Sequence, residues 1–255
     1  MSLPVFRERL NEGFVLSGWS SATDPSVHAA LLQAPIDAML FDMQHGLHDT
    51  ASIASGIAVA ARFGKPAVVR VPIEDRGMAS RALDMGASGV VMPMIETVEQ
   101  AAAFVSAVKY PPRGLRSFGP ARAVSLHTDN DYDAYTAVAD RETLAFAMIE
   151  TRSAIDNLEE IARLDGLDGL FVGPSDLSIA LSGNGRRAPQ GPECREAIAT
   201  ILSVARSAGK HPGIYAATVE EGIVYRDMGY AFVAVASDLG LLAGAADAMA
   251  RAMKA

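Results

Sequence analysis

The stretch LDMGASGVVMPMIET (Leu83–Thr97) contains one complete unit of the pattern that decides the fold. A helix-like segment ends at Gly86, and an apolar run without polar alternation follows at Gly89–Met94. Such runs are typical of parallel strands that are buried on both faces. The next helix-like segment begins at Thr97, a residue type that caps helix N-termini. The stretch therefore predicts a β-strand between two helices, which is the repeating unit of an α/β protein.

The same unit recurs along the chain of 255 residues, a length typical of one α/β barrel at roughly 250 residues. Eight strands are predicted, at Val15–Trp19, Ala38–Met43, Ala67–Val71, Gly89–Met94, Leu144–Ile149, Gly169–Val172, Gly213–Tyr215 and Ala231–Ala236. Helices are predicted at Asp49–Phe63, Glu74–Met85, Thr97–Val108, Thr151–Leu164 and Gly191–Ala208. We read Tyr110–Asp140 as an extended loop plus a helix, and loops of that length are usually functional.

The number of strands favours a single (β/α)8 TIM barrel over residues 1–255. A doubly wound open sheet is the competing fold, but it would prefer about five or six strands and a Gly-rich first turn. No linker rich in Pro, Gly or Ser divides the chain into domains. The apolar segment 239–254 fits either an ordinary eighth barrel helix or a helix exchanged with a partner subunit.

Composition excludes several classes of partner. The net charge of −8 and the lack of a basic run argue against nucleic-acid binding. No apolar stretch reaches the roughly 18 residues of a membrane span, and the start lacks the apolar core of a signal peptide. The single cysteine, Cys194, forms no internal disulfide and no cysteine-based zinc site. We therefore expect a cytoplasmic protein that binds a small molecule, with local positive charge if that molecule is an anion.

Polar residues at predicted strand ends mark the candidate site, because active sites of such barrels lie at the C-terminal ends of the strands. These residues are Trp19 and Ser20 after the first strand, Asp42, Gln44 and His45 after the second, Arg70 after the third, Glu150 after the fifth, and Ser175 and Asp176 after the sixth.

Two carboxylates on neighbouring strands, Glu150 and Asp176, are candidate ligands for a hard divalent ion such as Mg²⁺ or Mn²⁺. They would leave coordination positions for water and substrate oxygens. In the competing interpretation each is a helix-entry acid, and Ser175 and Asp176 merely cap the helix that follows.

His45 has a side chain whose ordinary pKa suits general acid–base chemistry. The alternative is a structural histidine bonded to a backbone carbonyl. Arg70 ends an apolar strand, where a guanidinium is costly unless it meets an anion. It could stabilise an enolate or a carboxylate oxygen, or it could form a salt bridge to Asp42 or Glu74.

Lysine and cysteine side chains are further candidate nucleophiles, but none of them lies at the end of a predicted strand. Lys65 and Lys210 precede strands, Lys109 follows a helix and Lys254 is near the chain end, so a Schiff-base aldolase is not favoured. Cys194 lies in a helix-like segment, which argues against a cysteine nucleophile. No P-loop or Gly-rich phosphate turn is present, so a phosphate ester or nucleotide is not favoured either.

Taken in order, the motifs resemble the metal-dependent, class II pyruvate aldolases typified by 4-hydroxy-2-oxoheptanedioate aldolase. The resemblance covers nearly the whole chain, from Gly18 to Asp238. It rests on FDMQHG (Phe41–Gly46), VVRVP (Val68–Pro72), LDMGASGVVMPMIET (Leu83–Thr97), YPPRGLRSFG (Tyr110–Gly119), MIET (Met148–Thr151) and DGLFVGPSDLS (Asp168–Ser178).

The resemblance implies a barrel of the phosphoenolpyruvate/pyruvate-domain type with a divalent metal (Mg²⁺ or Mn²⁺, with Co²⁺ as a further candidate) on Glu150 and Asp176. It implies that a 2-oxo acid chelates this metal, that backbone groups near Ser175 and Asp176 hold its carboxylate, and that Arg70 stabilises the enolate. His45 would be the acid–base group, with Asp84 raising its basicity. The resemblance also implies a homohexamer, a trimer of dimers with exchanged C-terminal helices.

The candidate role of Asp84 follows from the resemblance alone, because the predicted helices place this residue at the end of a helix and not at the end of a strand. Its contact with His45 would need the loop geometry or a neighbouring subunit. We also expect Trp19 and Met148 to contact substrate.

Two residues depart from the family pattern. Gln44 stands where the family usually has Glu, which removes a charge near the base. Met148 stands where the family often has a Gln that contacts substrate, and this puts the usual substrate in doubt.

The predicted function is reversible, metal-dependent cleavage of a 4-hydroxy-2-oxo acid to pyruvate, or a close 2-oxo acid, plus an aldehyde. One alternative is an acyl-CoA lyase of the same superfamily, with Arg113, Arg116 and Arg122 meeting the CoA phosphates. The other is a non-catalytic protein that binds a 2-oxo acid.

Overall fold

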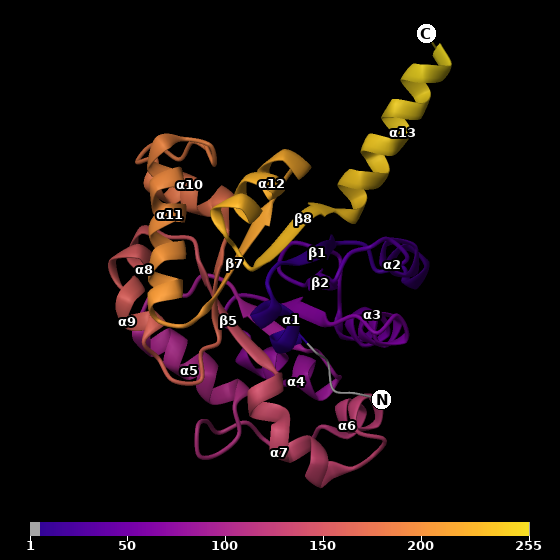
Figure 1. The fold of residues 1–255 in the computed structure, drawn as a ribbon, viewed down its shortest axis with the longest axis vertical. Helices are drawn as coiled ribbons and strands as arrows, with labels where there is room; N and C mark the ends of the chain where they lie inside the picture. Colours follow the sequence, from indigo (N-terminus) through magenta and orange to yellow (C-terminus); the bar gives the residue numbers. More distant parts are fainter. Residues whose placement is uncertain (1–5, 255) are drawn as a thin grey trace.

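The computed structural model describes residues 6–254 and contains a closed barrel of eight parallel strands in sequence order (Figure 1). The strands are β1 (Val15–Ser20), β2 (Ala38–Asp42), β3 (Ala67–Arg70), β4 (Gly89–Met92), β5 (Leu144–Ile149), β6 (Gly169–Val172), β7 (His211–Ala216) and β8 (Phe232–Ser237). The last strand returns to the first, where Phe232 pairs with Val15. The predicted (β/α)8 barrel is confirmed, and the doubly wound alternative is wrong.

Helices alternate with the strands and cover the outside of the barrel (Figure 1). They are α1 (Phe6–Glu12), α2 (Pro25–Leu32), α3 (Thr50–Arg62), α4 (Arg76–Asp84), α5 (Val98–Val108), α6 (Ala121–His127), α7 (Tyr132–Glu142), α8 (Arg152–Asp156), α9 (Leu158–Ala162), α10 (Pro174–Leu181), α11 (Pro192–Ser207), α12 (Val219–Met228) and α13 (Asp238–Lys254).

Two predicted segments differ from the structure. The segment Tyr110–Asp140 contains two helices, α6 and most of α7, rather than a loop and one helix. The predicted helix Thr151–Leu164 is divided into α8 and α9 at Asn157. The amide of Asn157 donates to the backbone oxygen of Glu96 at 2.9 Å and to that of Ser153 at 3.1 Å. Asn competes with helical hydrogen bonds in this way, which explains the break.

Large side chains fill the barrel interior, so the interior is a packed core and not an open pore. Phe6 of α1 closes the N-terminal end, with ring centroids 5.2 Å from Phe232 and 6.2 Å from Phe146. Trp19, Met148 and Phe171 belong to the same buried cluster. Such layers of apolar residues are typical of closed barrels of this size.

The C-terminal helix α13 extends away from the barrel (Figure 1). Its first residue, Asp238, is buried and accepts hydrogen bonds from the Ser20 hydroxyl at 3.1 Å and the Ala22 backbone N–H at 2.9 Å. Beyond Asp238, residues 239–249 are all exposed. Five large apolar side chains are among the exposed residues of this helix: Leu239, Leu241, Leu242, Met249 and Met253.

An apolar groove lies where an eighth outer helix would pack. It has a volume of about 460 Å³ and is lined in part by Leu31 and Ile36 on one side and Val219 and Ile223 of α12 on the other. None of the helices in residues 6–254 combines the length and apolar composition needed to cross a membrane.

Candidate active site

A cavity of about 280 Å³ opens at the C-terminal ends of the strands. Its lining residues are Trp19, Ser21, Asp42, His45, Arg70, Met148, Gly173, Pro174, Ser175, Asp176, Tyr215 and Ser237. This volume lies just below the roughly 300–1,000 Å³ range of ligand pockets, which suits a small metabolite. It brings together Trp19, His45, Arg70, Met148, Ser175 and Asp176 of the predicted site residues.

A buried ion pair fixes one wall of this cavity. Strands β2 and β3 place Asp42 and Arg70 side by side in register. The Arg70 Nε and Nη2 atoms each donate to Asp42 over 2.8 Å, and the guanidinium lies 4.7 Å from the Trp19 ring centroid. The two bonds and the stacking hold the guanidinium in one orientation. The predicted salt bridge to Asp42 is therefore confirmed. Arg70 also lines the cavity, and its stabilisation of a substrate oxygen stays a prediction.

Asp42 stays ionised despite being buried. Burial raises the pKa of Asp42, but the Arg70 pair and the backbone N–H groups of His45 and Gln44 outweigh burial and hold this pKa below its usual range. Asp42 therefore keeps a full negative charge, which the Arg70 guanidinium balances.

Glu150 ends β5 with only one of its two carboxylate oxygens occupied. Oε1 accepts the Met94 backbone N–H at 2.9 Å, whereas Oε2 is buried and has no partner within residues 6–254. Burial raises the pKa of Glu150 to about 7; the charge of Asp176 adds to the rise, and the Met94 bond and Arg70 oppose it. A buried oxygen without a partner is costly, so it indicates a missing ligand such as a cation.

Glycine is required at position 173, directly in front of this carboxylate. A Cβ atom built on Gly173 would lie 2.2 Å from Glu150 Oε2 and 2.6 Å from Met148 Cε. The absent side chain leaves open the space that faces the free carboxylate oxygen.

Asp176 and Ser175 lie in the first turn of α10, whose N-cap is Gly173 and has no side-chain capping bond. Neither side chain is at the N-cap position, although Asp176 is an acidic residue of the first turn, as the helix-entry interpretation expects. Asp176 is exposed and lines the cavity. The Ser175 hydroxyl accepts a hydrogen bond from Arg187 Nε at 3.0 Å.

The donor set fits a metal held by two carboxylates and substrate. Within residues 6–254 no group of three or more His, Cys, Asp and Glu side chains is placed to hold a metal ion. Glu150 and Asp176 interact electrostatically and offer oxygen ligands, the type that Mg²⁺ and Mn²⁺ prefer. Mg²⁺ commonly binds through one or two carboxylates and fills its other positions with water and substrate.

His45 is exposed at the cavity, and in the described chain its ring makes no hydrogen bond that would mark it as structural. His48 has the opposite character. Its ring nitrogens lie 3.1 Å from the hydroxyls of Ser20 and Ser52, and burial lowers the pKa of His48 to about 4. Of these two histidines, His45 is the one that combines an exposed position at the cavity with a ring that makes no hydrogen bond in residues 6–254.

The two residues that depart from the family pattern lie beside the Arg70–Asp42 pair, Met148 next to Arg70 and Gln44 next to Asp42. The Met148 sulfur is 3.9 Å from Arg70 Nη1 and lines the cavity. The Gln44 backbone N–H donates to Asp42 at 3.0 Å, and its side-chain oxygen is buried without a partner in residues 6–254.

Asp84 is not part of this cavity. It ends α4 and pairs at 2.6 Å with Arg116, whose side chain is fully buried and lies 4.6 Å from the Tyr110 ring centroid. Within the described residues of a single chain, no contact joins Asp84 to His45. Its predicted role stays untested.

The positions of three arginines argue against a binding site for CoA phosphates. Arg116 is buried, Arg122 donates to the backbone oxygen of Ala54, and Arg113 lies 3.8 Å from Asp165. These three arginines do not form one basic groove.

Sequence reasoning missed several residues of the cavity wall. Tyr215 from β7 packs edge-on against Trp19 at 4.7 Å, and Ser21 and Ser237 complete the rim. The signal for Tyr215 was weak because it lies in an apolar strand, where an aromatic residue usually belongs to the core.

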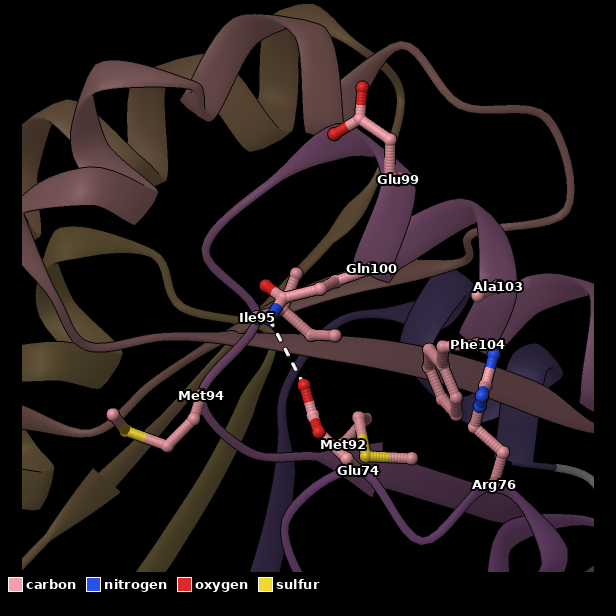
Figure 2. Close-up of a pocket in the computed structure, with 9 residues that line it drawn as sticks. All are labelled: Glu74, Arg76, Met92, Met94, Ile95, Glu99, Gln100, Ala103 and Phe104. Carbon is pink, nitrogen blue, oxygen red and sulfur yellow. Dashed lines mark hydrogen bonds between the residues drawn. The ribbon is translucent and has the colours of Figure 1, made fainter.

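A second cavity, of about 320 Å³, lies outside the barrel between the loop after β3 and helix α5. Figure 2 shows Glu74 beneath Gln100, to which it is bonded at 3.2 Å, and Arg76 beside Phe104. Met94 is among the residues that line this second cavity, and its backbone N–H donates to Glu150. Met94 has φ 54°, an uncommon conformation for a residue other than glycine.

Comparisons with known proteins agree with this geometry. Residues 16–245 match the family described as HpcH/HpaI aldolase/citrate lyase. The chain is 37% identical to the hydroxypyruvate/pyruvate aldolase of Rhizorhabdus wittichii, covering 92% of this chain and 93% of that protein. It is 36% identical to the 4-hydroxy-2-oxovalerate aldolase of Rhodococcus jostii, covering 98% and 96%. A crystal structure of an HpcH/HpaI aldolase/citrate lyase family protein from Burkholderia cenocepacia matches with a TM-score of 0.89 and 30% identity, covering 99% of this chain and 100% of that one.

Proposed function

Because this chain belongs to the HpcH/HpaI aldolase/citrate lyase family and is an aldolase, we propose that its barrel-top cavity reversibly cleaves a 4-hydroxy-2-oxo acid to pyruvate, or a close 2-oxo acid, plus an aldehyde. The observation that carries the proposal is the buried Glu150 Oε2 atom, which has no partner in residues 6–254 and faces the gap at Gly173. An oxygen in that environment is stabilised by a cation.

Glu150 and Asp176 would hold the divalent ion, with Mg²⁺ or Mn²⁺ preferred and Co²⁺ as a further candidate. Such an ion supplies a Lewis acid that polarises the 2-oxo group of the substrate. The backbone N–H groups at the start of α10, near Ser175 and Asp176, would hold the substrate carboxylate, because helix N-termini favour anions.

Arg70 would stabilise the negative charge that forms during cleavage. Its Nε and Nη2 atoms are occupied by Asp42, while Nη1 has only the weak acceptor Met148 in the described chain. This donor is preorganised, so it loses little freedom when it binds the developing enolate oxygen.

His45 would take the proton from the 4-hydroxyl group of the substrate. The C4–O bond then becomes the aldehyde carbonyl, the C3–C4 bond breaks, and its electron pair forms the enolate of the 2-oxo acid beside Arg70. A proton delivered to C3 completes the 2-oxo acid. The proposed role of Asp84 in raising the basicity of His45 requires a second copy of the chain to bring the two residues together.

The protein would be a homohexamer, a trimer of dimers in which segment 239–254 is exchanged between subunits. The exposed apolar residues of α13 and the apolar groove beside α12 support this arrangement, since large exposed apolar surfaces usually mark interaction sites. Replacing Leu242 and Met249 together with Asp should shift the protein to smaller species in light scattering. An unchanged molar mass would contradict the exchange.

A cytoplasmic location is part of the same proposal. It is supported by the single, buried Cys194, which is a free thiol.

The test is retro-aldol cleavage of a simple 4-hydroxy-2-oxo acid, followed by coupling pyruvate release to a dehydrogenase. We expect pyruvate release that EDTA abolishes and that added Mg²⁺ or Mn²⁺ restores. A folded protein that binds metal and pyruvate but releases no aldehyde would instead be a non-catalytic binder. Turnover of an acyl-CoA thioester alone would overturn the aldolase proposal.

A further inference from the structure

The loop between β4 and α5 holds one oxygen of Glu150 through a residue in an unfavourable conformation. The backbone N–H of Met94 donates to Glu150 Oε1 at 2.9 Å, whereas Oε2 is buried and has no partner in residues 6–254. Met94 has φ 54°, in the left-handed region that is unfavourable for residues with a Cβ atom. Such a conformation persists only where the surrounding structure holds it. The groups that hold Met94 therefore also fix Glu150.

Two side chains hold the chain that follows Met94. The Gln100 Oε1 atom accepts the backbone N–H of Glu96 at 2.8 Å and that of Thr97 at 3.1 Å. The amide of Asn157 donates to the backbone oxygen of Glu96 at 2.9 Å. The loop is thus fixed two residues after Met94, by a side chain of α5 and by a side chain at the junction of α8 and α9.

The direction of the Met94 N–H depends on this anchoring. The angle φ is the torsion about the bond from the amide nitrogen to Cα, so it relates the N–H direction to the chain that follows. If that chain were released, Met94 would return to the negative φ that residues with a Cβ atom prefer, and its N–H would turn relative to Glu150. Figure 2 shows the Met94 side chain directed away from Gln100, so the connection between them runs through the backbone.

We propose that Gln100 is a positioning residue for the metal site, which fixes the loop so that Met94 occupies one oxygen of Glu150 and leaves the other for a divalent ion. This inference rests on the proposed function, in which Glu150 is a ligand of that ion. Gln100 lines the second cavity and not the cavity of the candidate active site. Groups that orient a metal ligand commonly govern metal affinity without touching the metal.

A positioning role must be separated from a role in capping helix α5. Gln100 and Thr97 together form the capping box of this helix. The Thr97 hydroxyl accepts the Gln100 backbone N–H at 3.2 Å, while the Gln100 side chain accepts the Thr97 backbone N–H. Loss of either side chain should therefore destabilise α5 by a similar amount. Of the two side chains, Gln100 is the one that also binds Glu96, so the capping box provides a matched pair of variants.

The experiment measures the dissociation constant of Mn²⁺ for the full chain without substrate, from the paramagnetic resonance signal of free Mn²⁺. Gln100→Met keeps the length of the side chain but loses the acceptor. It should weaken Mn²⁺ binding about 10-fold, the lower end of the effect typical of groups that orient a metal ligand. Thr97→Val removes the other half of the capping box. Its denaturant midpoint should fall about as far as that of Gln100→Met, while its Mn²⁺ affinity should stay within about twofold of the wild type.

Gln100→Glu tests whether the acceptor is what matters. It keeps an oxygen for the N–H groups of Glu96 and Thr97, and it loses only the hydrogen bond that Gln100 donates to Glu74. Its Mn²⁺ affinity should stay within about threefold of the wild type. The assay is run at about 0.15 M salt, where the added charge is screened beyond about 8 Å.

Three results would overturn the proposal. Unchanged Mn²⁺ affinity in Gln100→Met would mean that the loop holds Glu150 without Gln100. Equal losses of affinity in Gln100→Met and Thr97→Val would mean that Gln100 only stabilises α5. Equal losses in Gln100→Met and Gln100→Glu would mean that the acceptor at Glu96 is not responsible.

Failure of the proposed function gives a different result. If the wild type binds no Mn²⁺, or if Glu150→Gln binds it as tightly as the wild type, Glu150 is not a metal ligand. Both results are obtained without any variant of Gln100, so they are distinguishable from a failure of the positioning role.

Discussion

Three lysines at the N-terminal end of the barrel are hydrogen-bonded within the protein, whereas at the C-terminal end one oxygen of Glu150 lacks a partner in residues 6–254, beside the complete Arg70–Asp42 pair. At the N-terminal end, the buried Lys109 ammonium donates to the backbone oxygens of Asp140 and Thr143 and to Asp168, over 2.7–2.9 Å. Lys65 and Lys210 each donate to two backbone oxygens at 2.7–2.8 Å. At the C-terminal end, Glu150 keeps a buried oxygen without a partner in the described chain.

This difference separates residues that stabilise the fold from residues that bind a ligand. A buried group with all its partners present gains nothing more from a ligand, so it serves stability. A group with a partner missing destabilises the empty protein and gains when a ligand arrives. Three predictions test the comparison, in order of expected effect.

The largest effect is expected for Glu150→Gln. Turnover should fall on the order of 10³-fold or more, because a metal ion supplies several kcal/mol of charge stabilisation. The unfolding free energy in EDTA at pH 8 should not fall. The pKa of Glu150 is raised to about 7 in the folded protein, so ionising it at pH 8 opposes folding and Gln removes that cost.

The measurements are steady-state rates, metal affinity by calorimetry and denaturant unfolding in EDTA. If the variant loses both activity and several kcal/mol of unfolding free energy, Glu150 stabilises the fold. The proposed difference between the two ends of the barrel would then be contradicted.

The next effect is expected for Lys109→Met at the other end. The unfolding free energy should fall by about 3 kcal/mol, because two buried backbone oxygens would lose their donor and Asp168 would keep only Arg7 as an ion-pair partner in residues 6–254. The turnover of the molecules that remain folded should be unchanged. Lys65→Met is the matched control, since Lys65 binds only backbone oxygens and should cost about 1 kcal/mol. Equal losses in the two variants would refute the importance of the Asp168 pair.

The smallest effect is expected for His45→Ala. Turnover should fall about 10²-fold, which is typical for loss of a general acid–base group. Metal affinity and the melting temperature should stay close to wild type, because the side chain is exposed and its ring makes no hydrogen bond within residues 6–254. Unchanged turnover would remove His45 from the mechanism.

The features that could be predicted from the sequence are those that depend on local residue patterns. All eight strands were located to within a few residues, because buried parallel strands are apolar runs whatever their neighbours. The positions of His45, Arg70 and Asp176 followed from the rule that strand ends converge. The free oxygen of Glu150 could not be predicted, since it depends on the backbone of Met94 and the gap at Gly173.

The features that could not be predicted depend on contacts between segments that are far apart in the sequence. Arg187 approaches Ser175 through a loop of irregular conformation, and no periodicity in the sequence encodes that contact. Asp84 was taken from the resemblance, and in a single chain it meets Arg116 rather than His45. The proposed approach of Asp84 to His45 stays a prediction, because neither the residue pattern nor the single chain brings the two together.

The close fit at Gly173 also limits how this enzyme can be redesigned. A side chain at that position would overlap Glu150 and Met148, so position 173 should be left out of any mutant library. Met148 and the loop that carries Arg187 line or border the same cavity without this restriction. A library that varies those positions would explore new aldehydes while leaving the carboxylates in place.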